Sequence, residues 1–218
     1  MPGINLKLAD DFAPEYDASI LQNNWIGPRV LFNLIQVNLF KQSQVLDLGI
    51  GTGESARPFV EKGHKVTGLD GSEKMLDECR RKKICDQLIF HNLEINPYPL
   101  PDNSFDAVVS NGVFHLIHPL QQVFQEVTRL LKPNGFFVFS YEATNSNSGS
   151  RQIESGIWEK ETKTGVLTYK HENRYIDKLL NKYQFEKIRQ TQFLAFVNQK
   201  SDTKFYFEAI AAQLILNR

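Results

Sequence analysis

A short apolar strand that runs directly into a glycine-rich turn constrains this chain more than any other feature. Residues 45–56 read VLDLGIGTGESA, so the apolar run Val45–Leu48 is followed by glycines at 49, 51 and 53, and residues 54–61 are able to form a helix. Glycine permits positive φ and lets the backbone approach a ligand closely, while free N–H groups at a helix start attract anionic groups. The segment predicts a strand–turn–helix unit with a ligand site at the turn.

Two nucleotide-binding patterns fit this turn poorly. A P-loop has Lys followed by Ser or Thr after its glycines, and this chain has Glu54-Ser55 there. The dinucleotide fingerprint G-x-G-x-x-G needs its third glycine one position later than Gly53. What remains is D-x-G-x-G-x-G, which begins at Asp47.

This pattern resembles motif I of the class I S-adenosylmethionine (SAM)-dependent methyltransferases, and later segments resemble the same family in the same order. Residues 91–117 resemble its adenine-binding segment and fourth strand, with the turn Pro101–Asp106 before that strand, and residues 126–136 resemble its helix–turn–strand before strand five. These pieces are typical of the type 11 (UbiE-like) core. Shorter pieces at the ends of the chain are similar to the lid of small-molecule methyltransferases (Tyr16-Asp17) and to the Williams–Beuren-region methyltransferase-like proteins (Gly165–His171).

The resemblance implies a SAM site assembled from several loops. Its candidate residues are Asp47, Gly49, Ile50, Gly51, Thr52, Gly53, Asp70, Gly71, Met75, Asn92, Leu93, Glu94 and Asn111. The three glycines would surround the amino acid end of SAM and Asp47 would reach its ammonium, directly or through water. Asp70, at the tip of the second strand, would accept both hydrogens of the ribose diol. The Asn92 side chain and the Leu93 N–H would contact adenine, and Met75 would pack on the purine or belong to the core.

The resemblance also implies direct methyl transfer, which needs neither a metal nor a covalent nucleophile. The catalytic residues are left unassigned. His115 follows the fourth strand and is a candidate for binding or deprotonating an acceptor, but it could equally pack under the next loop or cap the following helix. Tyr16 and His171 are further candidates, each with a structural role as the alternative.

Helical and strand patterns alternate along the chain, which is typical of an α/β protein. Strands are predicted at Gln44–Leu48 and Phe105–Ser110, and helices are predicted near Asn173–Lys182, after the N-cap Ser72, and from Pro28 at a helix start. We expect a Rossmann-like, doubly wound, seven-stranded sheet, mainly parallel, with helices on both faces and an antiparallel C-terminal hairpin near residues 185–196 and 204–212. The interpretation is one methyltransferase domain, residues 1–218, with a helical lid (1–40), a SAM-binding core (41–141), and an acceptor-side segment with the closing hairpin (142–218). Residues 142–150 are expected to be a loop.

Charge and composition limit the choice of partners. The chain has 25 basic and 25 acidic residues, which argues against a broad nucleic-acid surface. The basic run Arg80–Lys83 is either a local patch of that kind or a set of cations near a helix C-terminus. Cys79 and Cys85 are too few for a disulfide scaffold or a zinc site. Without a signal-peptide pattern or an apolar run of about 18 residues, a cytoplasmic protein is expected. A small-molecule acceptor is favoured, protein and lipid acceptors stay open, and the oligomeric state is left undetermined.

Two other classes of function share parts of this pattern. An NAD(P)-dependent oxidoreductase uses a similar half-fold, but the early third glycine, the terminal hairpin and the turn Pro101–Asp106 count against it. A catalytically inactive SAM-binding or assembly module would keep the same donor motifs. The identity of the acceptor, and whether O, N, C or S is methylated, lies beyond what these motifs encode.

Overall fold

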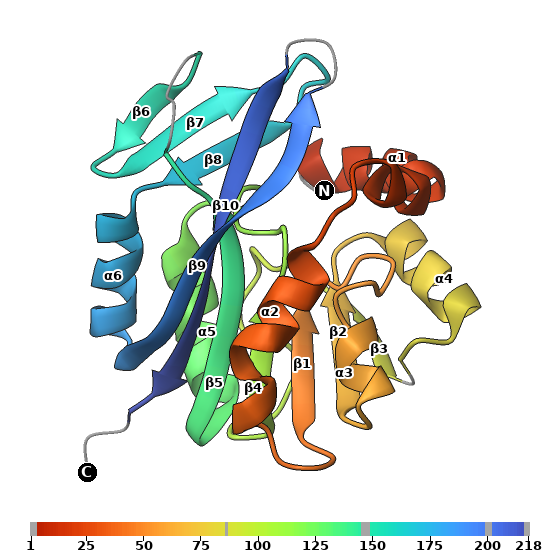
Figure 1. The fold of residues 1–218 in the computed structure, drawn as a ribbon, viewed down its shortest axis with the longest axis vertical. Helices are drawn as coiled ribbons and strands as arrows, with labels where there is room; N and C mark the ends of the chain where they lie inside the picture. The colour runs from red at the N-terminus through yellow and green to blue at the C-terminus, as the bar shows by residue number, and fades with distance from the viewer. Residues whose placement is uncertain (1–3, 86, 145–148, 199–201, 216–218) are drawn as a thin grey trace.

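A seven-stranded sheet runs through the centre of the computed structural model, which describes residues 4–85, 87–144, 149–198 and 202–215 (Figure 1). The strand order is β3-β2-β1-β4-β5-β10-β9. The strands are β1 (Gln44–Leu48), β2 (Lys65–Asp70), β3 (Gln87–Phe90), β4 (Phe105–Ser110), β5 (Leu131–Glu142), β9 (Phe185–Asn198) and β10 (Thr203–Leu214). The first five pair in parallel, and β10 pairs antiparallel with both β5 and β9. The expected sheet, including its antiparallel C-terminal hairpin, is confirmed.

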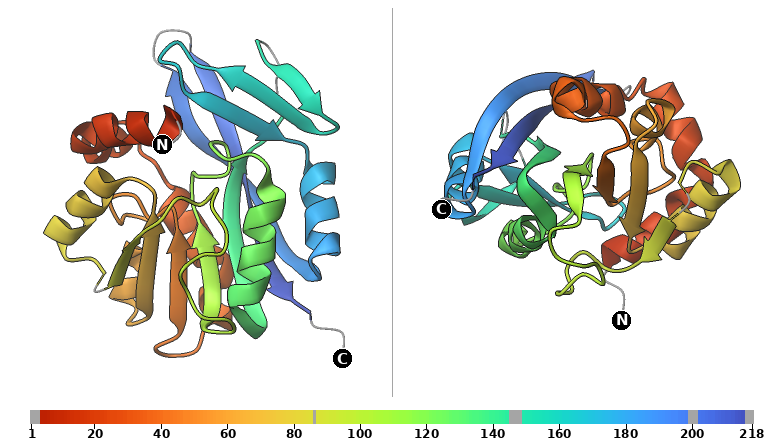
Figure 2. Two further views of the ribbon diagram at one scale, coloured as in Figure 1. Left: turned by 180° about the vertical axis from the view of Figure 1, so that it is seen from behind. Right: turned by 90° about the horizontal axis from the view of Figure 1, so that it is seen from below.

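The central strands are apolar because helices cover both of their faces. Val45, Leu46 and Leu48 of β1 are fully buried, as are Val108 and Val109 of β4. On one face they pack in a cluster with α2 (Gly27–Ile35), α3 (Arg57–Glu61) and α4 (Glu73–Lys82). On the other face the cluster contains α5 (Leu120–Leu130) and α6 (Asn173–Lys182), as Figure 2 shows from behind. The two-sided arrangement agrees with the sequence pattern.

Local sequence signals place several helix boundaries correctly. Ser72 is the N-cap of α4, and its hydroxyl accepts the Met75 N–H at 3.1 Å. Pro28 lies in the first turn of α2, where its missing N–H costs nothing. The helix after the glycine turn begins at Arg57, later than the expected residue 54, because the intervening residues form turns.

The N-terminal segment differs from expectation. The sequence places residues 12–17 before a helix, but they lie inside the 19-residue helix α1 (Ile4–Gln22), which includes Pro14. Proline disfavours a helix interior, so local propensity argues against this arrangement. The helix is held by its contacts with the core, described below. A 3-10 turn, η1 (Gln36–Asn38), follows α2.

The segment after β5 is also more structured than expected. β5 continues to Glu142, Ala143 bridges to His171, and residues 145–148 of the expected loop lie outside the described residues. A second, three-stranded antiparallel sheet follows, formed by β6 (Arg151–Glu154), β7 (Ile157–Glu161) and β8 (Leu167–His171). Its charged strands lack the apolar alternation that would have revealed it.

No helix in the described ranges is long and apolar enough to cross a membrane.

Candidate SAM-binding site

The parallel sheet brings the predicted donor residues to one edge, where the carboxyl ends of β1, β2 and β4 meet. The Gly49 N–H donates to the Leu69 carbonyl at 2.8 Å, which ties the glycine loop to β2. Asp70 completes the connection, since its Oδ2 accepts the Gly51 N–H and its Oδ1 accepts the Ser72 N–H, both at 2.8 Å. Asp70 therefore joins the glycine loop to the start of α4 at this edge of the sheet.

The glycine at position 49 is required by both backbone conformation and space. Its φ is +72°, a region that other residues rarely adopt. A Cβ built there would lie 2.4 Å from Val113 Cγ2, at the tip of β4. Gly53, with φ +95°, is equally restricted, because its Cβ would lie 2.8 Å from Cys79 Sγ. At positions 49 and 53 the loop therefore approaches its neighbours more closely than a residue with a Cβ would allow.

Asp47 places an unpaired carboxyl group in the interior. It is fully buried, and neither of its carboxyl oxygens has a hydrogen-bond partner among the described residues. Burial raises the pKa of Asp47 to about 8, with a further contribution from Cys79, while the nearby Ser55 hydroxyl offsets this only in part. A buried carboxyl group normally has a partner, because leaving it unpaired is costly. An ammonium group such as that of SAM would supply one.

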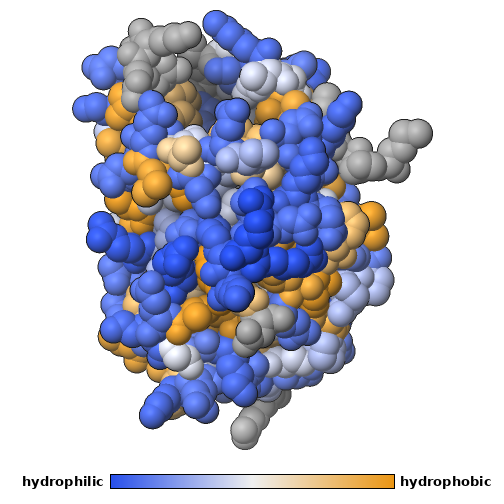
Figure 3. Space-filling model, turned by 90° about the vertical axis from the view of Figure 1, so that its right-hand side faces the viewer, coloured by the Kyte–Doolittle hydropathy of each residue, from blue (hydrophilic) through white to orange (hydrophobic). Residues whose placement is uncertain are grey.

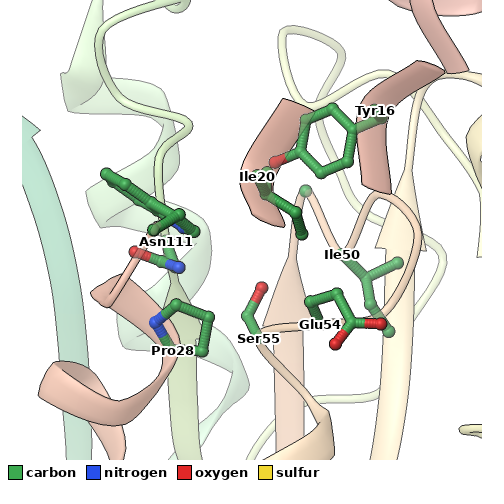
Figure 4. Close-up of a pocket in the computed structure, with 9 residues that line it drawn as sticks. Tyr16, Ile20, Pro28, Ile50, Glu54, Ser55 and Asn111 are labelled. Atoms are coloured by element: carbon green, nitrogen blue, oxygen red, sulfur yellow. The ribbon is translucent and has the colours of Figure 1, made fainter. Parts of the chain in front are cut away.

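A small pocket opens beside the glycine loop (Figure 4). Figure 4 shows that Tyr16 and Ile20 reach into it from α1, opposite Ile50 and Ser55 of the glycine turn. Its complete lining is Tyr16, Ile20, Trp25, Pro28, Gly49, Ile50, Glu54, Ser55 and Asn111. Burial, reinforced by Asp70 and other carboxylates, raises the pKa of Tyr16 to about 12. The Tyr16 hydroxyl is therefore neutral near pH 7 and suited to donating a hydrogen bond.

Two aspartates of α1 fasten this helix over the site. Asp17 accepts hydrogen bonds from the Thr52 hydroxyl and from Lys82 Nζ, both at 2.6 Å. Seven residues earlier, Asp10 accepts the Ser72 hydroxyl at 2.5 Å. A spacing of seven places both on one face of a helix, a signal that sequence reasoning missed because Pro14 lies between them. Site neighbours that sequence reasoning did not predict include Asp10 and Lys82 and, in the pocket lining, Ile20, Trp25, Pro28, Glu54 and Ser55.

The segment expected to hold adenine follows β3. The Asn92 Oδ1 accepts the Glu94 N–H at 2.9 Å, so one lone pair of the oxygen expected to face adenine already holds a turn. Leu93 and Met75 are buried, whereas Glu94 is exposed. At the other end of the site, the Ser140 hydroxyl donates to the Asn111 Oδ1 at 3.1 Å.

Gly71 lies beside α1, because a Cβ built on it would be 2.7 Å from Leu6 Cδ2. The N-terminal helix therefore covers the part of the site expected to hold adenine as well as the part expected to hold the amino acid.

The two candidate histidines occupy different surroundings. His115 is partly exposed after β4, its ring centroid 5.3 Å from that of Phe207. Burial lowers its pKa to about 4, and its Nδ1 has no partner among the described residues. His171 is fully buried, donates from Nε2 to the Phe114 carbonyl at 3.1 Å and stacks on Tyr175. His171 thus joins β8 to the core, and only His115 of this pair has access to solvent.

The basic run of α4 is largely neutralised by neighbouring acids. Arg80 pairs with Glu73 and Asp77, and Arg81 pairs with Glu78. Lys82 Nζ contacts Asp17 and also Glu54, the latter at 2.8 Å. Figure 3 shows hydrophilic side chains gathered across the face that α1 and α4 present. This pattern favours the helix-terminus explanation of the run over a nucleic-acid patch.

Comparison with known proteins points to one family. Residues 46–139 match the model of a methyltransferase domain (type 11). The malonyl-[acyl-carrier protein] O-methyltransferase of Enterobacter lignolyticus is 34% identical over 136 residues, which cover 62% of this chain and 50% of that protein. The chain thus aligns with half the length of this relative.

Solved structures share the fold at low sequence identity. A chain from the complex of the Haloferax volcanii Trm112 methyltransferase activator with a candidate methyltransferase superposes with a TM-score of 0.76 at 18% identity, covering 98% of this chain and 99% of that one. The Burkholderia thailandensis 1,6-didemethyltoxoflavin-N1-methyltransferase, which holds S-adenosylhomocysteine (SAH), gives 0.69 at 18% identity, with 99% and 93% covered. With its domain match over residues 46–139, its sheet order and its glycine loop, the chain contains a methyltransferase domain similar to those of the class I SAM-dependent methyltransferases, whose methyl donor is S-adenosylmethionine.

Proposed function

We propose that this protein transfers a methyl group from SAM to a small-molecule acceptor by direct in-line displacement. Bound SAM supplies a methyl group that its sulfonium makes electrophilic; the acceptor atom bonds to that carbon, the C–S electron pair stays on sulfur, and SAH and a proton are released. The observation that carries the proposal is Asp47, an unpaired carboxyl group buried beside the glycine loop and close enough to Tyr16 of α1 to raise the pKa of that tyrosine. Such a group is retained where a cationic ligand completes it.

The residues at this edge suit each part of the donor. Asp47 would pair with the ammonium, and the loop at Gly49, Gly51 and Gly53 would lie along the amino acid end. Asp70 has lone pairs left for a ribose diol after accepting two backbone N–H groups. The Leu93 N–H and the Asn92 side chain would hold adenine. We propose residues 1–40 as lid, 41–141 as donor core and 142–218 as the acceptor side.

His115 is our candidate for the acceptor side of the reaction. Its pKa, lowered to about 4, keeps it neutral near pH 7, and it follows the strand whose tip carries Asn111. A neutral imidazole with so low a pKa is a weak base, so it would act by accepting a hydrogen bond from an acceptor hydroxyl or amine. Tyr16 would close the donor side, and His171 would act through packing.

The proposal is tested by calorimetry and a transfer assay. We expect SAM and SAH to bind with dissociation constants on the order of 10 μM, in the usual range of enzyme substrates, and NADPH not to bind. Methyl-labelled SAM is then incubated with a malonyl thioester, phenols and heteroaromatic amines, the first chosen from the named activity of the Enterobacter relative. Absence of SAM and SAH binding overturns the proposal, NADPH binding favours the oxidoreductase, and SAM binding without turnover favours the binding module.

Loosening the fastening of α1 is expected to speed release of the donor product. Asp17→Asn removes the charge that Lys82 Nζ and the Thr52 hydroxyl contact, while the helix itself keeps its packing. Because the Asp17 side chain is 39% exposed, the ion pair is a weak one, and we expect SAH to dissociate about three-fold faster. Stopped-flow displacement of SAH measures this rate.

Asp11→Asn is the matched control for that experiment. Asp11 lies on the same helix, and its ion pair with Lys74 is long (3.8 Å) and exposed. We expect the control to leave the SAH dissociation rate unchanged. Equal rates in the wild type and Asp17→Asn would mean that this contact does not restrain the lid.

A further inference from the structure

The segment between β3 and β4 is held from beneath by two charged residues of α5. Glu126 is 4% exposed, and its Oε2 accepts the Tyr98 N–H at 2.7 Å. Arg129 donates from Nη2 to the Tyr98 carbonyl at 3.1 Å and from Nη1 to the Leu100 carbonyl at 2.8 Å. It also pairs with Glu126 at 2.6 Å. Both backbone groups of Tyr98 are therefore bonded to a rigid helix.

Tyr98 carries this restraint to the residue expected to meet adenine. Its hydroxyl donates to the Leu93 carbonyl at 2.8 Å, and its side chain is 2% exposed. The next group along the chain, the Glu94 N–H, donates to the Asn92 Oδ1. The peptide unit between Leu93 and Glu94 is thus bonded through both its C=O and its N–H, which leaves its plane one orientation.

The preceding peptide unit, between Asn92 and Leu93, differs in the bonding of its N–H group. The Leu93 N–H has no hydrogen-bond partner among the described residues, although Leu93 is only 6% exposed. A buried backbone donor normally has a partner, because an unpaired one costs free energy comparable to a lost hydrogen bond. The bonded peptide unit on its C-terminal side and the bonded Asn92 side chain on its N-terminal side restrain the chain at this N–H and leave it available as a donor.

From this arrangement we propose that Tyr98, held by Glu126 and Arg129, is a positioning residue for the donor: it orients the Leu93 N–H toward a ring nitrogen of adenine. The inference rests on the proposed SAM site and adds the source of its selectivity for the base. An N–H fixed in direction favours a ring nitrogen that accepts and rejects one that carries a hydrogen, since two donors would then face each other.

Tyr98→Phe tests this role with two probes, SAH and S-inosylhomocysteine, in which the amino group of the base is replaced by a carbonyl and the ring nitrogen beside it is protonated. We expect the wild type to prefer SAH. In Tyr98→Phe we expect SAH affinity to fall about five-fold, the scale of one hydrogen bond, with little change for the inosyl compound. The ratio of the two dissociation constants is the readout that a general loss of stability would not move.

Tyr175→Phe is the matched control. Tyr175 is also buried, and its hydroxyl donates to Gln121 Oε1 at 3.2 Å from α6 rather than from the segment expected to hold adenine. We expect it to lower thermal stability without changing the ratio. Arg129→Lys is a second test, because lysine lacks the planar fork that reaches both carbonyls, and it should shift the ratio in the same direction as Tyr98→Phe.

The outcomes separate this inference from the proposed function. If wild-type protein binds neither SAM nor SAH, the proposed function itself is overturned. If wild-type protein binds SAH but the ratio is the same in wild type, Tyr98→Phe and Tyr175→Phe, only the positioning role is overturned. A preference for SAH that is reduced in Tyr98→Phe and Arg129→Lys alone supports it.

Discussion

Asp70→Asn is expected to weaken SAM binding at least 100-fold. The two Asp70 oxygens accept the Gly51 and Ser72 N–H groups, and in the proposed complex they would also accept the two ribose hydroxyls. Asparagine keeps one acceptor oxygen and replaces the other by an NH₂ group, which would oppose a backbone N–H. Each hydrogen bond to a charged group contributes about 1.5–3 kcal/mol. The replaced oxygen would lose two of them, one to a backbone N–H and one to a ribose hydroxyl, which costs about 3 kcal/mol or more. Calorimetric titration with SAM measures the change.

Asp106→Asn separates loss of the site from loss of stability. Asp106 likewise accepts a backbone N–H, from Gln44 at 2.8 Å, and pairs with Lys132, but it lies at the beginning of β4, at the opposite edge of the sheet. We expect the control to lower the melting temperature and leave SAM affinity unchanged. If both variants lost affinity equally, the effect of Asp70 would be structural and its ribose role wrong.

Asp47→Asn is expected to move affinity and stability in opposite directions. Removing the carboxylate deprives the donor ammonium of its partner, and breaking a buried charge pair costs about 2 kcal/mol or more, about 30-fold in affinity. In the ligand-free protein the same change removes a buried ionisable group that has no hydrogen-bond partner among the described residues, so the free energy of unfolding is expected to rise. Calorimetry gives the affinity, and urea unfolding of the ligand-free protein gives the stability.

The pH dependence makes that prediction sharper. The pKa of Asp47 is raised from 3.8 to about 8 in the folded protein. Between these values the folded state holds a proton that the unfolded state has lost, so this group reduces stability as pH rises from about 4 to about 8. The amide side chain of the Asp47→Asn variant cannot titrate. The free energy of unfolding of this variant minus that of wild type should therefore increase from pH 5 to pH 8. A difference that stays constant across this range would contradict the raised pKa of Asp47 in the folded protein.

Donor binding should also release protons. At pH 7 Asp47 is mostly protonated without a ligand, and pairing with an ammonium would favour its ionised form. Titrations in buffers of different ionisation enthalpy should detect proton release on SAM binding by wild type and less release by Asp47→Asn. Equal release by the two proteins would place the ammonium elsewhere.

The sequence by itself determined the elements whose signals are local. It predicts Gln44–Leu48, Phe105–Ser110 and Asn173–Lys182 with the boundaries that the structure has. Their signals are continuous apolar runs for strands buried on both faces, and apolar residues at helical spacing. The motif order around the glycine turn, together with Asp70 at the end of β2, is sufficient to predict the family and its donor. Both depend on residues close together in the chain.

Tertiary structure alone decided how the site is closed and charged. That residues 12–17 continue a helix through Pro14 follows from contacts between residues more than 30 positions apart, such as Asp17 with Thr52 and Asp10 with Ser72. The sheet β6-β7-β8 depends on pairing between charged strands with no apolar alternation. The raised pKa of Asp47 arises because distant segments exclude water from it without supplying a partner. Burial and long-range pairing are properties of the packed chain, and no local pattern encodes them.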